Sequence, residues 1–183
     1  MRKEIVVKII ETLKNTRNEF SFFNFNECLK KSVELTENEK SEIFEAFTNF
    51  FLRYFETNAM YGLDAEGNHV VTRKKVFVKT SFKTDDNLYP QISGNAANKE
   101  ISELIKEARK NGFDKKTDFI MYVCNYDFLT CFLKDNFKKA IRENNGEWEH
   151  NPYILILDEK TIVKMIHWGN IFFWKKLTEF FKN

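Results

Sequence analysis

Three consecutive stretches set the architecture of this chain: SEIFEAFTNFFLRYF at residues 41–55, LDAEGN at 63–68 and VFVKTSF at 76–82. The first predicts an aromatic helix, because its apolar residues recur every three or four positions. Thr36 and Glu39 precede it at the spacing of a capping box, which predicts the start of the helix. The apolar arc is wide, so we expect this helix to be covered on more than one side and to lie against a sheet.

The residues before this helix predict a helical N-terminal element. Residues 2–14 carry apolar side chains on one face and charges on the other, as in an amphipathic helix. Residues 19–25, EFSFFNF, partly alternate and predict a short extended segment, while residues 26–32 suit a short helix. We therefore expect residues 1–35 to form a helical element in front of a main domain at residues 36–183.

After residue 60 the pattern changes from helical to extended. We interpret residues 60–63, 69–72 and 76–82 as three short strands of an antiparallel meander. Strands that alternate with helices further along predict an α/β (α+β) fold with a mixed central sheet flanked by helices. These later elements are a helix at 99–111, a strand at 119–124, a helix capped by Asp127, a strand at 152–157, a helix at 161–168 capped by Asp158, and a final aromatic helix.

The composition limits the classes of function. With 29 basic and 27 acidic residues the net charge is +2, so any contact with nucleic acid has to be local. The 20 Phe residues either serve stacking or reflect a compositional bias, and most of them fall on periodic apolar faces. Three cysteines without close pairs argue against a disulfide framework, and the three His residues form no zinc motif. Without a long apolar run or a secretory pattern, we expect a cytoplasmic protein that has no membrane span.

The order of helix, three strands, helix and strand resembles the core of the restriction-endonuclease-like nucleases, the PD-(D/E)XK superfamily, and is most similar to the Mrr-type enzymes. Phe44 and Glu45 look like the pair that opens the first core helix of that family. Asp64 stands where the family's first acidic residue falls, and the strand that ends in Lys79 resembles the strand with the catalytic lysine. Residues 153–166, YILILDEKTIVKMI, resemble the late strand and helix of Mrr-type enzymes.

This resemblance implies a metal-dependent DNA endonuclease, or a nuclease subunit, of a restriction or mobile-element defence system. Asp64 and Lys79 would form its core pair with Glu45 assisting, and Asp64 and Glu66 would hold Mg²⁺. In such sites carboxylates bind the metal ion that activates water, and a lysine stabilises the developing charge. DNA is the expected partner.

Phe77 departs from the family pattern, because the second acid should stand two residues before the lysine, on the same face of the strand. A phenyl ring ligates no cation. Either an acid from elsewhere in the chain takes the place of the missing second acid, or the chain is a catalytically inactive module that binds DNA or a protein partner. These residues also have structural interpretations. Asp64 and Glu66 would be turn residues, Lys79 a snorkelling strand lysine and Glu45 a solvated helix charge. The candidates for a migrated acid are Glu45, Glu66, Asp85 and Asp86.

A second candidate group lies at residues 158–160, where Asp158 and Lys160 have the same two-residue spacing at the end of a strand. Asp127, after the preceding strand, is its candidate partner carboxylate, since α/β proteins place their sites at the carboxyl ends of strands. Asp127 and Asp158 are equally interpreted as N-caps of the helices that follow them.

Two surfaces are candidates for binding. The basic residues next to the predicted strand would contact phosphates, or form an ordinary solvated turn. The aromatic run IHWGNIFFW at residues 166–174 is a candidate surface for a protein partner or a homodimer. The basic residues are Arg73, Lys74, Lys75 and Lys83.

Overall fold

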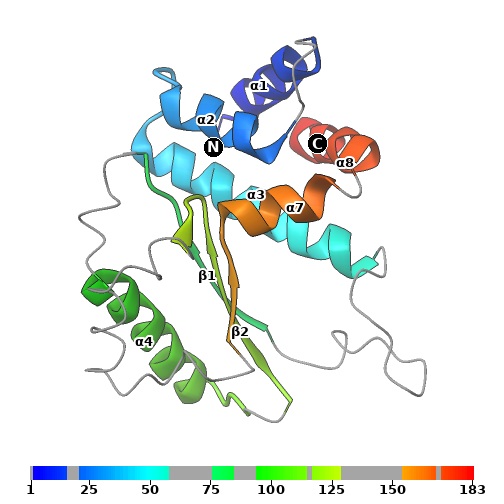
Figure 1. Cartoon of the computed structure of the whole chain (residues 1–183). Helices are drawn as coiled ribbons and strands as arrows, with labels where there is room; N and C mark the ends of the chain where they lie inside the picture. The colour runs from blue at the N-terminus through cyan, green and yellow to red at the C-terminus, as the bar shows by residue number, and fades with distance from the viewer. Residues whose placement is uncertain are drawn as a thin grey trace.

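A computed structural model describes residues 2–15, 21–57, 76–84, 94–114, 117–128, 154–167 and 170–183 (Figure 1). These residues form six helices and a three-stranded sheet in the order β1-β2-β3. The helices are α1 (Lys3–Asn15), α2 (Phe22–Lys31), α3 (Glu37–Thr57), α4 (Gly94–Lys110), α7 (Glu159–His167) and α8 (Asn170–Lys182). The strands are β1 (Val76–Ser81), β2 (Phe119–Cys124) and β3 (Ile154–Leu157).

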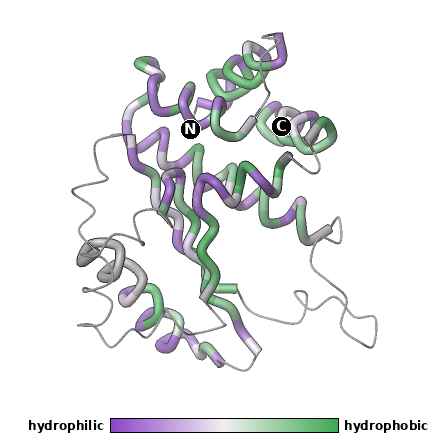
Figure 2. Tube along the Cα trace, in the orientation of Figure 1, coloured by the Kyte–Doolittle hydropathy of each residue, from purple (hydrophilic) through white to green (hydrophobic). Residues whose placement is uncertain are grey.

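All three strands run in the same direction. Val76 on β1 lies opposite Phe119 on β2, and Ile120 on β2 lies opposite Ile154 on β3. Alternate residues of β2 enter two separate hydrophobic cores, Met121 and Val123 on one face and Ile120, Tyr122 and Cys124 on the other. The central strand is therefore buried on both faces, which explains the continuous apolar run FIMYVC. In Figure 2, hydrophobic residues predominate along the strands in the middle of the molecule.

Helices cover both faces of the sheet. In Figure 1, α4 lies on one side, while α3 and α7 lie on the other and α1, α2 and α8 stack above them. The smaller core joins α4 to the sheet through Leu104, Ile105 and Ala108. The larger core is rich in aromatic residues, and in it Phe47 of α3 stacks on Phe22 at a centroid distance of 4.9 Å. The expected α/β (α+β) class, with helices flanking a sheet, is confirmed. The described strands are all parallel, so they do not form the mixed sheet that was expected.

The boundaries of the N-terminal helices follow from local capping chemistry. Thr36 N donates to Glu39 Oε2 at 2.9 Å, and Glu39 N donates to Thr36 Oγ1 at 3.3 Å, which confirms the predicted capping box of α3. The extended segment predicted at residues 19–25 is wrong from residue 22 onward, because α2 begins at Phe22. Ser21 Oγ accepts from Asn24 N at 3.2 Å and caps this helix, whose residues Phe22 and Phe25 are buried.

Several later elements lie close to their predicted positions. The strand predicted at 76–82 is β1, but its neighbour in the described sheet is β2, in parallel. The other two strands of the predicted meander, at 60–63 and 69–72, lie outside the described residues, as does most of the helix predicted after Asp127. The helix predicted at 99–111 starts earlier, at Gly94, and ends before Gly112, whose φ of 78° suits a helix terminator.

Residues on both sides of position 35 enter the same larger core, since Ile10 of α1 and Leu29 of α2 belong to it together with Phe47 of α3 and Trp174 of α8. None of the described helices is both long and apolar enough to cross a membrane.

Candidate functional site

Lys79 lies within β1, and its side chain is exposed to solvent. Two positions earlier, the ring of Phe77 packs edge-on against Phe113, with the centroids 5.9 Å apart and the planes at 79°. Phe113 follows α4, is partly buried and packs against the smaller core. Because residues two apart in a strand share a face, Lys79 lies on the α4 face of the sheet beside this aromatic pair. A packed ring thus occupies the position at which the nuclease pattern has its second acid.

The acids expected around Lys79 are not assembled among the described residues. Asp64 and Glu66 lie outside those residues, and so do Asp85 and Asp86. Glu45 is exposed on α3, whose core residues pack on the opposite face of the sheet. Within the described parts of the chain, no carboxylate forms an ion pair with Lys79.

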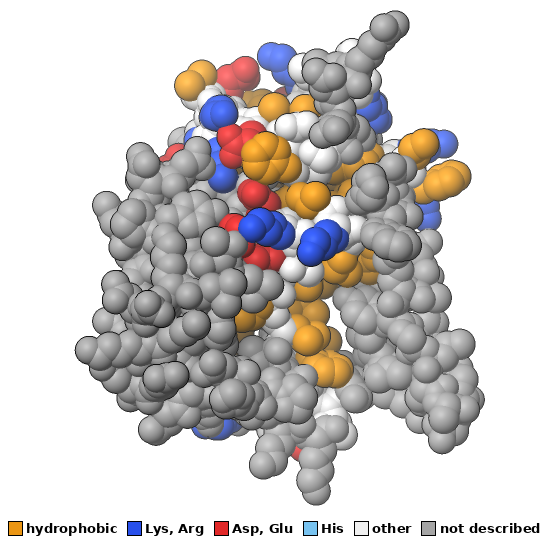
Figure 3. Space-filling model, in the orientation of Figure 1, with side chains coloured by type: hydrophobic (Ala, Val, Ile, Leu, Met, Phe, Trp, Pro, Cys, Tyr) orange, Lys and Arg blue, Asp and Glu red, His pale blue; other side chains and the backbone are white. Residues whose placement is uncertain are grey.

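The second candidate group is assembled at the carboxyl edge of the sheet. Since the three strands are parallel, their carboxyl ends meet at this edge. Asp127, which follows β2, forms an ion pair with Lys160 in the first turn of α7. The pairing joins two residues that lie 33 positions apart in the sequence. Figure 3 shows acidic and basic side chains gathered in the middle of this face of the molecule, over the start of α7.

Asp158 has a structural role at the same edge. Its side chain is fully buried, and Oδ1 accepts from Thr161 N at 2.9 Å and from Thr161 Oγ1 at 2.7 Å. This is the N-cap of α7, as the sequence predicted. The Asp158 carboxylate therefore stabilises the first turn of α7.

A buried amide network at this edge has no signature in the sequence. Asn26 of α2 donates from Nδ2 to Asn125 O at 2.8 Å and to Glu159 Oε2 at 2.5 Å. In return, Asn125 donates from Nδ2 to Asn26 Oδ1 at 3.0 Å. Asn26 and Asn125 are 1% and 0% exposed, so these bonds form away from water. The network connects α2 with the end of β2 and the start of α7.

Burial raises the pKa of the Glu159 carboxyl above its ordinary value. The positive charge of Lys30 and the hydrogen bond from Asn26 oppose this rise, while the negative charges of Glu27 and Asp127 add to it. A half-buried carboxyl group among other charged groups is typical of functional sites, but ion-pair networks with purely structural roles have the same property.

Asn125 also fixes the end of β1. Its Oδ1 accepts from Lys83 N at 2.7 Å, and its Nδ2 donates to Lys83 O at 2.9 Å. The amide thereby extends the pairing of β1 and β2 beyond the strands themselves. Of the basic residues expected to contact phosphates, Lys83 is placed here with a half-buried side chain. Arg73, Lys74 and Lys75 lie outside the described residues.

The C-terminal aromatic run divides between the interior and the surface. Phe173 and Trp174 are buried in the larger core, while Ile171 and Phe172 are 76% and 71% exposed. The side chains of residues 167–170 lie outside the described set. The part of the predicted interaction surface that the structure describes is thus the first turn of α8.

Comparison of the chain with protein families, with characterised proteins and with solved structures gave no match. Among the described residues, no group of three or more His, Cys, Asp or Glu side chains is placed to hold a metal ion. The expected Mg²⁺ ligands Asp64 and Glu66 are not among those residues.

Proposed function

We propose that this chain is a metal-dependent DNA endonuclease, or the nuclease subunit of a restriction or mobile-element system, with a restriction-endonuclease-like core. The observation that carries the proposal is Lys79, an exposed amine within β1 of a parallel sheet in the order β1-β2-β3. A long helix precedes this strand and a helix follows it, as the resemblance implies. Lys79 is exposed although the residue opposite it on β2, Tyr122, is fully buried.

Each proposed residue has a chemical role. The ammonium group of Lys79 would stabilise negative charge that develops on the phosphate during cleavage. Asp64 and Glu66 would hold Mg²⁺, which in such sites activates water for attack on phosphorus. Lys83 and residues 73–75 would contact the phosphates of the DNA backbone and so position it without reading its sequence.

Plasmid cleavage tests this proposal. Supercoiled plasmid is incubated with the protein and Mg²⁺ or Mn²⁺, and nicked and linear products are measured over time. We expect Asp64→Ala and Lys79→Ala each to lower the rate by about a hundredfold, in line with the loss of one charge-stabilising group at an active site. Lys110→Ala, which changes an exposed lysine at the end of α4, is the matched control and should cleave like the wild type. Intact plasmid at high protein concentration, or cleavage unchanged in both variants, would reject the endonuclease.

The packing of Phe77 favours a second candidate, a nuclease-fold module without catalytic activity that binds DNA or a protein. The contact between Phe77 and Phe113 fills the position of the second acid with apolar atoms. Such a module would bind labelled duplex DNA equally well with EDTA and with Mg²⁺, and would cleave it in neither case. Phe77→Glu offers a further distinction, since only an otherwise complete site would gain cleavage from the added carboxylate.

A further inference from the structure

We propose that the start of α8 docks on the surface of an anionic lipid bilayer, with Ile171 and Phe172 inserted at the interface and Lys175 and Lys176 in contact with lipid phosphates. We call these four residues the α8 docking surface. The inference does not depend on the proposed nuclease function. It is supported by the exposure of the apolar pair, by the position of the lysines around it and by the charge that these lysines retain.

The two apolar side chains project into solvent from a turn that is held in place. Ile171 and Phe172 are 76% and 71% exposed, while the next two residues, Phe173 and Trp174, are at most 1% exposed in the larger core. Because the core anchors this turn, the projecting pair would lose little conformational freedom on insertion. In Figure 3, hydrophobic side chains project beside Lys or Arg at the edge of the molecule where α8 lies. Adjacent large apolar side chains in water mark an interaction surface more often than scattered ones do.

The helical repeat places the two lysines on either side of the apolar pair. Successive residues of a helix are about 100° apart around its axis, so Phe172 lies opposite the buried Phe181 and near the middle of the outward face. Lys175 and Lys176 follow one turn later, about 60° to one side of Phe172 and about 40° to the other. Both lysines are exposed. The outward face of α8 therefore has an apolar centre with a basic residue on each side.

The lysines of the α8 docking surface keep their charge. Within the described residues, neither of them forms an ion pair with a carboxylate. Lys176 Nζ lies 5.9 Å from the centre of the Tyr54 ring, and such a contact leaves the ammonium group charged. Glu179 is exposed on the same helix, but it stands about 10 Å along the axis from the apolar pair. The partial positive charge of a helix N-terminus adds to the attraction for anions at this end of α8.

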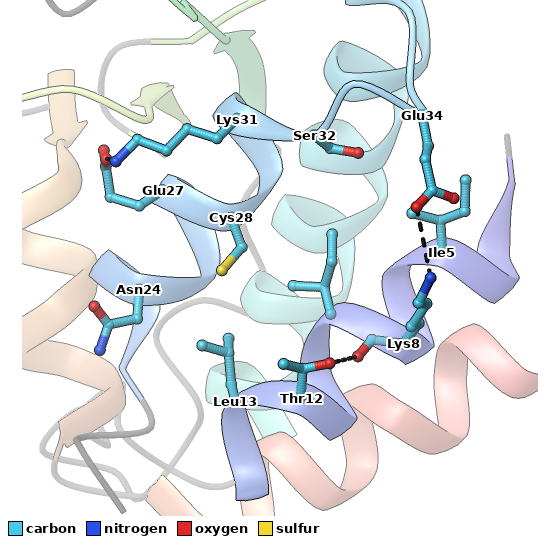
Figure 4. Close-up of a pocket in the computed structure, with 11 residues that line it drawn as sticks. Ile5, Lys8, Thr12, Leu13, Asn24, Glu27, Cys28, Lys31, Ser32 and Glu34 are labelled. Carbon is cyan, nitrogen blue, oxygen red and sulfur yellow. Dashed lines mark hydrogen bonds and ion pairs between the residues drawn. The ribbon is translucent and has the colours of Figure 1, made fainter. Parts of the chain in front are cut away.

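The pocket between α1 and α2 provides a contrast (Figure 4). There, Lys8 Nζ lies 3.5 Å from a carboxylate oxygen of Glu34. Lys31 Nζ lies 2.8 Å from a carboxylate oxygen of Glu27. Basic groups that already have acidic partners gain little when they exchange them for an anionic ligand. The lysines of the α8 docking surface have no such partner to give up within the described parts of the chain.

A bilayer interface accepts every part of this surface. Apolar side chains enter the boundary between headgroups and acyl chains, while lysines next to them keep their ammonium groups among the lipid phosphates. Each lysine near an anionic leaflet strengthens the attraction. Single-stranded DNA would also contact the lysines and stack a base on Phe172, but it would leave the aliphatic Ile171 in water. The adjacent pair of exposed apolar side chains therefore favours lipid as the partner.

Co-sedimentation of the full chain with lipid vesicles tests the proposal. We expect binding to vesicles of phosphatidylcholine and phosphatidylserine, weaker binding to phosphatidylcholine alone, and a smaller difference between the two at high salt. Phe172→Ser should weaken the binding by about tenfold, because a large apolar side chain no longer leaves water. Val33→Ser is the matched control, since Val33 is 97% exposed on another part of the surface, and this variant should bind like the wild type.

Reversal of charge tests the role of the lysines. Lys175→Glu combined with Lys176→Glu should weaken binding to the anionic vesicles by about tenfold or more. Lys106→Glu combined with Lys110→Glu makes the same change in net charge on α4, where both lysines are exposed, and should bind nearly like the wild type. Circular dichroism spectra that match the wild type establish that each variant is folded.

Three results would overturn the proposal. The first is that the wild type does not bind the anionic vesicles, and the second is that Phe172→Ser binds them as well as Val33→Ser does. The third is that both double variants lose the same affinity, which would mean that net charge alone causes the binding. Without vesicle binding, a loss of affinity for single-stranded DNA in Phe172→Ser would assign the surface to nucleic acid. A mass that rises with concentration only when Phe172 is present would assign it to a protein contact.

Discussion

Asn26 of α2 and Asn125 at the end of β2 donate hydrogen bonds to each other, although 99 positions separate them in the sequence. Each amide also binds a third group, Glu159 in the case of Asn26 and the backbone of Lys83 in the case of Asn125. The pair therefore connects the helical N-terminal region to the ends of β1 and β2 and to the start of α7. Buried networks of this kind stabilise a fold only while every member has its partners.

Asn26→Ala should lower the free energy of unfolding by about 2–4 kcal/mol, because it removes the bonds of Asn26 to the buried backbone oxygen and side-chain amide of Asn125 and to the half-buried carboxylate of Glu159. Urea denaturation measures the loss. If the two amides act as a pair, Asn26→Ala and Asn125→Ala combined should cost clearly less than the sum of the two single changes. Additive losses would mean that the two side chains stabilise the protein independently.

These amides also show why the candidate site was only partly predictable. Asp127, Asp158 and Lys160 could be found because acids and lysines at strand ends form a local pattern. Asn26 gives no such pattern, since nothing within α2 indicates which distant backbone group its amide meets. A tertiary contact determines its role, and one sequence does not specify that contact.

Glu159→Gln should change how stability depends on pH. The folded protein holds the proton of Glu159 more tightly than the unfolded chain, whose carboxyl has a pKa of about 4.3. The stability from this group is therefore fully present below that pH and is lost as the pH rises through the raised pKa of the folded state. We expect Glu159→Gln to gain stability relative to the wild type between pH 4 and pH 7.

Unfolding of both proteins at a series of pH values provides the test. Comparing them at each pH removes the contributions of titrating groups that do not interact with Glu159. Glu27, Lys30 and Asp127 do interact with it, so the difference reports Glu159 together with these three groups. A stability difference that stays constant with pH, or that favours the wild type as the pH rises, would contradict the assignment to Glu159.

Glu39 should affect the pH dependence of stability in the direction opposite to Glu159, because its pKa is lowered in the folded protein. Arg2 donates from Nε and Nη2 to its two carboxylate oxygens at 2.9 and 3.0 Å, and together with the bonds from Thr36 this lowers the pKa of Glu39 to about 2. The resulting stability is present above the pKa of the unfolded chain, about 4.3, and is lost as the pH falls toward 2. Glu39→Gln should therefore make stability depend less on pH in that acidic range.

Arg2→Met removes only one of the two causes of the lowered Glu39 pKa, because it removes the ion pair and keeps the capping box. It should remove part of the acid dependence that Glu39→Gln removes. Equal acid dependence in the wild type and Glu39→Gln would exclude this carboxylate as a source of the effect.

The larger core shows what the sequence could predict well. In α3, the periodic residues Phe44, Phe47 and Phe51 are all at most 1% exposed, because a helical repeat of apolar side chains buries itself wherever an apolar surface is available. The extended segment predicted around Phe22 and Phe25 failed for a related reason. The spacing of two closely placed Phe residues fits a strand as well as a helix, and Ser21, acting as an N-cap, favours the helix.

Thr48 is a polar exception within this aromatic helix. It is 0% exposed, and its Oγ1 has no hydrogen-bond partner among the described residues. Thr48→Val keeps the shape of the side chain and removes the buried hydroxyl, and the two residues have similar helix propensities. We therefore expect the free energy of unfolding to rise by about 1 kcal/mol.

Thr48→Ser is the matched control, since it keeps the hydroxyl and removes a buried methyl group, and it should lower the stability by about 1 kcal/mol. Loss of stability in Thr48→Val would mean that the hydroxyl has a partner in the folded protein.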